Sequence, residues 1–371
     1  MASRKKGKSA KARKAQRPGN TRPARKSTAI KALATGPITL KEAQALVAAS
    51  HPVSKARSAA VPPTNPADVG RARRDLEARR ERERRRRIQE FTETLTLMKR
   101  RGARAPAPKG KQKPPAGAQE PKDASFKPLQ ILAEGDSWFD YPKPFFGGSI
   151  IPRLEPLLGV PILNLAKAGD EVRYMLGVKE RKILMEQLTH GCPAGGPWDA
   201  LLFSGGGNDI VDNPMALWVK DWQKGVPPVN LINQPRFSAA LELVRAGYED
   251  LILLRNRLSP DTHLFFHSYD FAIPDGRGVC FLGPWLKPTF DLRGFPTQGD
   301  GFAVVKELLT QFEQMQKSLP SQNITLILTQ GTLAPVVGSW DNELHPEKAG
   351  FNAFAEMFRA KIKAVFPARV A

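Results

Sequence analysis

The sequence predicts an α/β protein, namely a three-layer α/β/α sandwich with a five-stranded, mainly parallel, flavodoxin-like sheet behind a basic extension. From about residue 129 to residue 365, short apolar segments alternate with helical segments. This alternation is typical of a parallel sheet that is covered on both faces. The formal charge is +21, but residues 1–125 carry +23 and residues 126–371 carry −2. We therefore expect a basic extension over residues 1–125 and a near-neutral globular domain over residues 126–371.

Most of the extension is predicted to lack a packed core. Residues 1–36 hold almost no large apolar side chains, so they cannot bury enough surface to offset the entropy of ordering. Thr39 and Glu42 form a capping-box pattern, which predicts a short helix to about residue 49. Residues 103–123 are rich in Pro, Ala and Lys and indicate a semi-extended linker.

A long charged helix is expected over residues 67–101, with Gly102 as its C-cap. Its first half mixes Arg with Asp and Glu, and its second half places four apolar residues on one face, namely Ile88, Phe91, Leu95 and Met98. Two interpretations stay open. The helix is either a solvated charged helix with a short docking stripe, or an electrostatic attachment to nucleic acid or an anionic membrane surface.

The expected strands of the domain are short, apolar and separated by helices. They are residues 129–133, 161–165, 199–203, 262–266 and 323–328. The expected helices are residues 150–158, 171–189, 238–258, 302–319 and 346–365. Two long insertions, residues 211–235 and 272–299, separate some of these elements.

The loops after the first three strands each carry a residue suited to acyl chemistry. Ser137 follows the first strand in a Gly-Asp-Ser turn, which is also what an ordinary turn looks like. Gly169 follows the second strand and allows close approach of its backbone N–H to a ligand. Asn208 follows the third and offers a neutral amide donor. Parallel strands gather these loops along one edge, where the N–H groups of Ser137 and Gly169 and the Asn208 amide could form an oxyanion hole.

A serine nucleophile needs a base, and the chain has five histidines. His345 is the best candidate by position because it lies in the loop after the last strand. His267 ends the fourth strand at the same edge and is a serious rival. The other three are less suitable: His51 lies in the extension, His190 ends a helix and His263 lies within a strand.

Four short motifs in order resemble the conserved blocks of the SGNH (GDSL-type) hydrolases. They are Gly135-Asp136-Ser137, Gly169, Gly206-Gly207-Asn208-Asp209 and His345-Pro346, and the resemblance covers about residues 129–366. It implies an ester hydrolase in which Ser137 attacks a carbonyl, His345 removes the serine proton, and Ser137, Gly169 and Asn208 hold the oxyanion.

One block departs from that family. The position three residues before the histidine, usually Asp, is Asn342, whereas Asp341 lies four before it. Asn accepts a hydrogen bond from imidazole but does not stabilise the imidazolium as a carboxylate does. The orienting residue is therefore Asp341, or Asn342 with a Ser–His dyad as the active unit.

The function expected from these residues is a serine esterase, lipase or acetylesterase that needs no cofactor and no metal. The substrate would be a small-molecule or lipid ester, and four tryptophans would line the pocket: Trp138, Trp218, Trp222 and Trp285. The alternative is a binding or targeting protein attached to nucleic acid or an anionic membrane through residues 1–125, with the hydrolase part secondary or inactive.

Three features of the sequence bear on where in the cell the protein is expected. Two cysteines cannot build a disulfide framework, and no run of about 18 apolar residues spans a membrane. The basic N-terminus lacks the apolar region of a secretory signal. We expect a cytoplasmic protein, with export by a signal-independent route left open.

Overall fold

The structure is a computed structural model that describes residues 36–50, 66–106, 126–141, 148–279 and 283–370. Residues 37–371 form one compact unit. The predicted division of the chain at residue 125 falls inside this unit.

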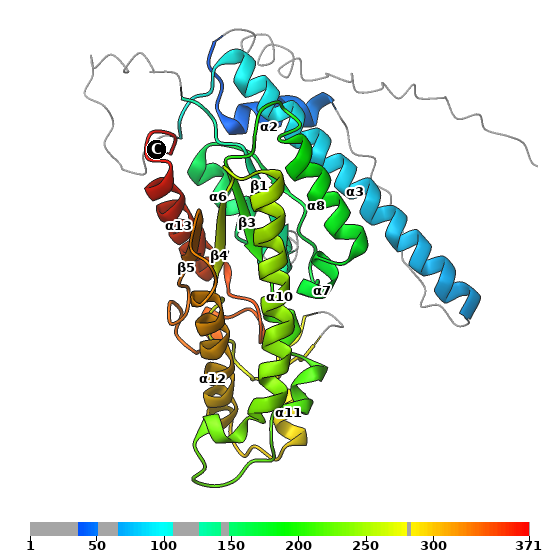
Figure 1. The fold of residues 1–371 in the computed structure, drawn as a ribbon, viewed down its shortest axis with the longest axis vertical. Helices are drawn as coiled ribbons and strands as arrows, with labels where there is room; N and C mark the ends of the chain where they lie inside the picture. Colours follow the sequence, from blue (N-terminus) through cyan, green and yellow to red (C-terminus); the bar gives the residue numbers. More distant parts are fainter. Residues whose placement is uncertain (1–35, 51–65, 107–125, 142–147, 280–282, 371) are drawn as a thin grey trace, which may run out of the picture. The chain divides into compact units, whose positions relative to one another are not determined.

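A five-stranded parallel sheet lies at the centre of the unit, which confirms the predicted fold class (Figure 1). The strands are β1 (Ile131–Gly135), β2 (Ile162–Asn164), β3 (Ala200–Ser204), β4 (His263–His267) and β5 (Ile324–Ile327). Their order is β2-β1-β3-β4-β5, and every adjacent pair is parallel. Gly135 lies opposite Ser204, so the carboxyl ends of the two central strands are level.

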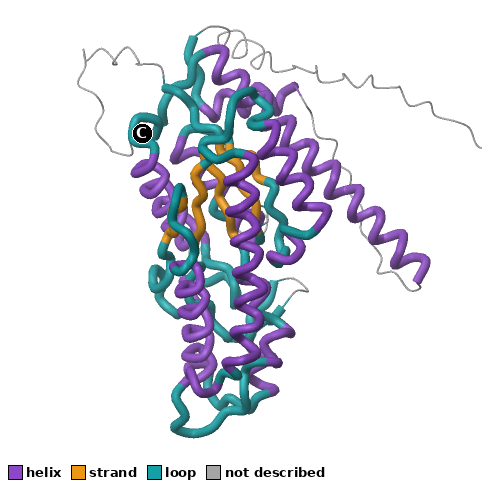
Figure 2. The backbone as a smooth tube through the Cα atoms, in the orientation of Figure 1, coloured by secondary structure: helices purple, strands orange, loops and turns teal. Residues whose placement is uncertain are grey.

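The principal helices form two groups around the sheet (Figure 2). In one group, α6 (Ile151–Leu158) packs against α13 (Lys348–Val365). In the other, α10 (Gln234–Leu258) packs against α7 (Val172–Met175), α8 (Val178–His190) and α12 (Gln298–Lys317). Right-handed crossovers in this strand order place the two groups on opposite faces, which gives the three layers.

Three helices differ most from their predicted bounds, and among them α12 begins at Gln298 rather than at about residue 302, because the Thr297 side chain caps it. The helix expected over residues 171–189 is divided into α7 and α8, because Gly177 adopts an extended backbone with ψ of 165° before α8 begins. Helix α10 begins earlier than expected because the Asn233 side chain caps it, accepting a hydrogen bond from the Arg236 N–H.

The core is continuous across the sheet. Every residue of β1 and β3 is buried, as expected for strands with helices on both faces. Shorter elements complete the fold: α4 (Ser137–Asp140), α9 (Gly207–Ile210), α11 (Lys287–Leu292) and 3₁₀ helices at Asn213–Leu217, Pro228–Leu231 and Val337–Ser339. Within the described residues, no helix is long and apolar enough to cross a membrane.

The described helices of the N-terminal extension pack within this unit. The predicted capping box begins α2 (Leu40–Ser50), with the Thr39 N–H donating to the Glu42 carboxylate at 2.8 Å. Helix α3 (Pro66–Arg101) contacts β2, and its Phe91 and Leu95 join the main core. Met98 joins a second small core with residues of α2. The predicted apolar stripe of this helix is therefore a docking surface.

Candidate active site

The first strand delivers Ser137 to the edge of the sheet through a tight turn. A Cβ at Gly135 would lie 2.5 Å from the Ser204 carbonyl oxygen, so only glycine fits there. Asp136 then caps α4 by accepting a hydrogen bond from the Trp138 N–H at 2.9 Å. Ser137 is the first residue of that helix, where a backbone N–H has no acceptor within the helix. The Ser137 N–H is thus suited to bind an anion.

The side chains of Ser137 and His345 meet although 208 positions separate them. The distance between Ser137 Oγ and His345 Nε2 is 2.7 Å. Both are nearly buried, with 8% and 5% of their surfaces exposed. This is the geometry of a nucleophile in contact with its base.

Asn342, rather than Asp341, contacts the other imidazole nitrogen. Asn342 Oδ1 lies 2.9 Å from His345 Nδ1 and also accepts hydrogen bonds from the backbone N–H groups of Leu344 and His345. Because all these partners approach one atom, the oxygen must face them, and Nδ1 must carry the proton. Nε2 of the neutral ring is then an acceptor for the Ser137 hydroxyl.

Asp341, the first candidate for the orienting acid, lies behind Asn342. Its carboxylate accepts hydrogen bonds from the Tyr141 hydroxyl at 2.8 Å and from Asn342 Nδ2 at 3.3 Å. The Asp341 N–H donates to the His345 carbonyl, which closes a tight loop and turns Asn342 inward. Tyr141 also stacks on the His345 ring, with centroids 4.1 Å apart. Sequence reasoning missed Tyr141, although its spacing of four from Ser137 at the end of a helical turn is a usable signal.

Burial sets the protonation state of the base. Desolvation lowers the pKa of His345 to about 3. The described partner of His345 Nδ1 is the neutral Asn342 amide, which does not oppose this effect as a carboxylate would. The imidazole is therefore neutral at neutral pH and ready to accept a proton.

The loops after β2 and β3 lie against each other beside this pair. The Lys167 N–H donates to the Gly135 carbonyl at 2.8 Å, which joins the β2 loop to the end of β1. Asn208 Nδ2 donates to the Asp170 carbonyl at 3.0 Å, which uses one of its two hydrogens. Gly169 has a φ of +82°, and a Cβ built there meets no atom within 4 Å. The space beside its Cα is thus open.

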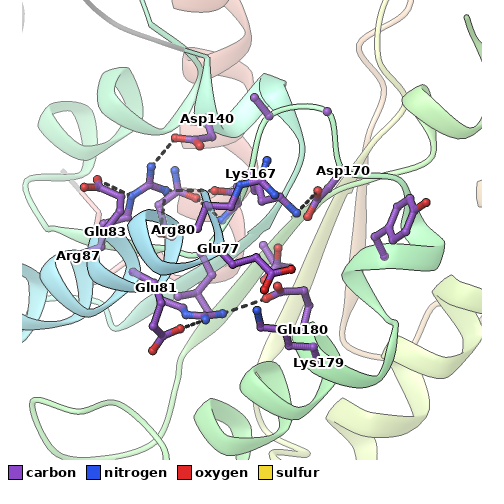
Figure 3. A pocket seen from close by; sticks show the side chains of 18 of the residues that line it. Glu77, Arg80, Glu81, Glu83, Arg87, Asp140, Lys167, Asp170, Lys179 and Glu180 are labelled. Carbon is purple, nitrogen blue, oxygen red and sulfur yellow. Dashed lines mark hydrogen bonds and ion pairs between the residues drawn. The ribbon is translucent and has the colours of Figure 1, made fainter. Parts of the chain in front are cut away.

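A cavity of about 860 Å³ adjoins the Gly169 loop (Figure 3). It lies between α3 and the residues that follow β2, and charged side chains of both signs line it. Glu134, at its wall, is almost wholly buried, and this burial raises its pKa to about 8. The N-terminal helix is thus a neighbour of the loop that carries a candidate oxyanion donor.

The four predicted pocket tryptophans have different places. Trp138 and Trp218 are each 4% exposed and lie in the core, so they do not form a pocket wall. Trp222 is partly buried against the same core. Trp285 alone of the four contacts His345, edge-on with centroids 6.0 Å apart.

Glu343 holds the second insertion beside the histidine loop. Its buried carboxylate accepts hydrogen bonds from four backbone N–H groups, those of Gly276, Trp285, Leu286 and Lys287. Glu343 is not among the site residues predicted from the sequence. The backbone groups that it anchors lie 56 to 67 positions away in sequence, so no local sequence pattern reveals this role.

His267, the rival base, belongs to a separate buried network. Both His267 and Ser204 have no exposed surface, and His267 Nε2 lies 2.8 Å from Ser204 Oγ. Ser204 donates to Asp136 Oδ1 at 2.7 Å, and the other Asp136 oxygen accepts from the Tyr269 hydroxyl. A substrate has no access to this pair. His51 falls outside the described residues, and His190 and His263 bond to the Glu186 carbonyl and the Thr325 hydroxyl.

No protein-family model and no curated protein sequence matches this chain. Several solved structures of hydrolases are similar to it in fold. A lipase from a goat rumen metagenome is 17% identical, with a TM-score of 0.40, over 62% of this chain and 96% of the lipase. An extracellular lipase from Streptomyces rimosus is 13% identical, with a TM-score of 0.39, over 62% of this chain and 99% of the lipase. A carbohydrate esterase of family 3 from Talaromyces cellulolyticus is 8% identical, with a TM-score of 0.39, over 64% of this chain and 97% of the esterase.

Two further matched structures are described as a putative GDSL-like lipase from Parabacteroides merdae and a putative SGNH hydrolase from Slackia heliotrinireducens. These low identities and TM-scores concern the fold alone. The activity is therefore inferred below from the residues of the site.

Proposed function

We propose that this chain is a serine hydrolase that cleaves carboxylic esters through an acyl-enzyme on Ser137. The observation that carries the proposal is the 2.7 Å contact between Ser137 Oγ and His345 Nε2 at the carboxyl end of a parallel sheet. In open α/β sheets this edge is where ligands bind. The neutral, Nδ1-protonated imidazole is the form that can take the serine proton.

In the first half-reaction, Ser137 Oγ attacks the ester carbonyl carbon while its proton passes to His345 Nε2. The carbonyl oxygen becomes an oxyanion, for which the donors are the Ser137 and Gly169 N–H groups and the Asn208 amide. When the intermediate collapses, the C–O bond to the alcohol breaks and His345 returns the proton to the departing alcohol. Water then repeats the sequence on the acyl-enzyme and releases the acid.

Asn342 would hold the imidazole in place in this scheme, with Tyr141 and Asp341 behind it. The proposed substrate class is a small-molecule or lipid ester. The contact of Trp285 with the His345 ring supports Trp285 as a pocket residue that contacts the acyl or alcohol part.

The test is a comparison of the wild type with Ser137→Ala on short nitrophenyl esters, together with fluorophosphonate labelling and mapping of the modified residue. We expect turnover and labelling in the wild type and neither in the variant. Equal turnover by both proteins, or labelling at another serine, would remove the proposal.

The alternative function, attachment to nucleic acid or an anionic membrane through residues 1–125, stays a prediction, as does a cytoplasmic location. In the described part of the extension, Arg84, Arg85, Arg86 and Arg87 all form ion pairs with glutamates of α3, which reduces the charge that they present to a partner. Binding of the intact chain to DNA or anionic vesicles at low salt would test the prediction.

A further inference from the structure

One arginine of the N-terminal helix joins three segments of the unit. Arg87 Nη1 donates to the Asn164 carbonyl at 3.3 Å and to the Ala166 carbonyl at 3.1 Å. Arg87 Nη2 donates to Asp140 Oδ1 at 2.7 Å, and Nε donates to Glu83 Oε1 at 3.2 Å on its own helix. Figure 3 shows this guanidinium between Glu83 and Asp140. Each nitrogen of the guanidinium is thus in use.

The segments that Arg87 joins carry the two halves of the candidate site. Asn164 and Ala166 begin the loop that leads to Gly169, a candidate oxyanion donor. Asp140 is the last residue of α4, the helix whose first residue is Ser137. A second bond, from Asn164 Nδ2 to the Phe139 carbonyl at 2.8 Å, links the same two segments. Arg87 therefore lies where a shift in either segment would change the distance between nucleophile and oxyanion donor.

We propose that Arg87 is a positioning residue of the hydrolase site, so that the N-terminal helix α3 is part of the catalytic framework. The inference rests on the proposed function of Ser137. Arginine suits this place because its planar guanidinium directs several donors at fixed angles, here to two carbonyls and a carboxylate, whereas a lysine ammonium is a single point with rotatable donors. Its side chain is 26% exposed, so the ion pair with Asp140 is partly shielded from solvent.

The experiment compares Arg87→Ala and Arg87→Lys with Arg86→Ala in the full chain. Arg86 is the matched control because, among the described residues, it bonds to Glu83 and Glu90 on the same helix. For Arg87→Ala we expect kcat for a nitrophenyl ester to fall about tenfold with KM within about twofold, since misplaced donors weaken the transition state and not the bound ester. Arg87→Lys should recover part of the loss, and Arg86→Ala should match the wild type.

Amide hydrogen exchange gives a second readout that does not depend on turnover. Arg87→Ala should speed exchange in residues 165–170 relative to Arg86→Ala, while β3 and β4 stay protected. The inference is overturned if Arg87→Ala equals Arg86→Ala in kcat and exchange, or if exchange rises throughout the unit. If Arg87→Ala does not fold, Arg87→Lys is compared with Arg86→Ala in its place, by kcat and by amide hydrogen exchange. A wild type no faster than Ser137→Ala would instead remove the proposed function, whatever the Arg87 variants do.

Discussion

Two serine–histidine pairs lie close together at the end of this sheet, and they differ in what their imidazoles can do. Ser137 and His345 are 2.7 Å apart, and Ser204 and His267 are 2.8 Å apart. The two distances alone do not separate them. Exposure separates them partly, since Ser204 and His267 are wholly buried while Ser137 keeps some exposed surface.

The hydrogen-bond partner of the imidazole Nδ1 distinguishes the two serine–histidine pairs completely. His345 Nδ1 faces the Asn342 carbonyl oxygen and must donate, so Nε2 is free to accept the Ser137 proton. His267 Nδ1 accepts the Tyr269 N–H at 3.2 Å, so a neutral His267 carries its proton on Nε2 and donates to Ser204. Burial lowers the pKa of His267 to about 3, so it is neutral. The first pair thus has the arrangement that the proposed function requires of a base and its nucleophile, and the second is a chain of hydrogen bonds that ends on Asp136.

Replacing the two serines gives the largest contrast. Ser137→Ala should lower turnover about 10⁴-fold or more, with little change in the free energy of unfolding, because it removes the nucleophile. Ser204→Ala should instead lower the free energy of unfolding by about 1–3 kcal/mol, because Asp136 loses a donor and His267 loses an acceptor. Ester turnover and denaturant unfolding of both variants check this. Loss of turnover only in Ser204→Ala would reverse the assignment of the two pairs.

Replacing the two histidines should give the next largest contrast. His345→Ala should lower kcat about 10³-fold, the usual contribution of a general base. His267→Ala leaves a cavity among Trp138, Phe139 and Phe358, and should lower the free energy of unfolding by about 2–4 kcal/mol. Ester turnover and denaturant unfolding of both histidine variants check this prediction. A His267→Ala variant that is stable but inactive would contradict the comparison.

The fold and the meeting of Ser137 with His345 were accessible from sequence for a physical reason. Apolar segments of strand length alternate with helical ones, and a parallel sheet brings the ends of its strands to one edge, so Ser137 and His345 could be expected to meet. The choice between Asp341 and Asn342 was not accessible, because it depends on which side chain a tight loop turns inward. The function of Arg87 was also hidden, since an arginine in a run of arginines gives no sign of the carbonyls that it will meet.

The neutral orienting residue makes the pH dependence a sharper test. Because the base works only when neutral, activity is present above its folded pKa and is lost as pH falls through it. With the pKa of His345 at about 3, kcat/KM of the wild type should show no decline near pH 6.5, where a free histidine titrates.

Asn342→Asp should raise the pKa of His345 by about 1–3 units, because a carboxylate at Nδ1 favours the imidazolium, and the acid limb of the profile should move up accordingly. Asn342→Asp combined with Asp341→Asn is the companion variant, since it avoids two adjacent carboxylates. A wild-type acid limb near pH 6.5, or an Asn342→Asp profile that does not move, would contradict the role of the neutral amide.

The smallest expected effect concerns the residue behind the amide. Tyr141→Phe keeps the ring that stacks on His345 but removes a hydroxyl that accepts from Asn342 Nδ2 at 2.9 Å and donates to Asp341. We expect kcat to fall about threefold as Asn342 loses one of its restraints, with KM unchanged.

Tyr248→Phe is a matched control, because the buried Tyr248 hydroxyl also makes one bond of each kind, to the Gly205 carbonyl and from Gln316 Nε2. Both variants should lose about 1 kcal/mol of unfolding free energy, but only Tyr141→Phe should lose kcat. Equal kcat in the two variants would mean that Asn342 holds the imidazole through its contacts with Leu344 and His345 alone, and that the Tyr141 hydroxyl serves stability rather than the base.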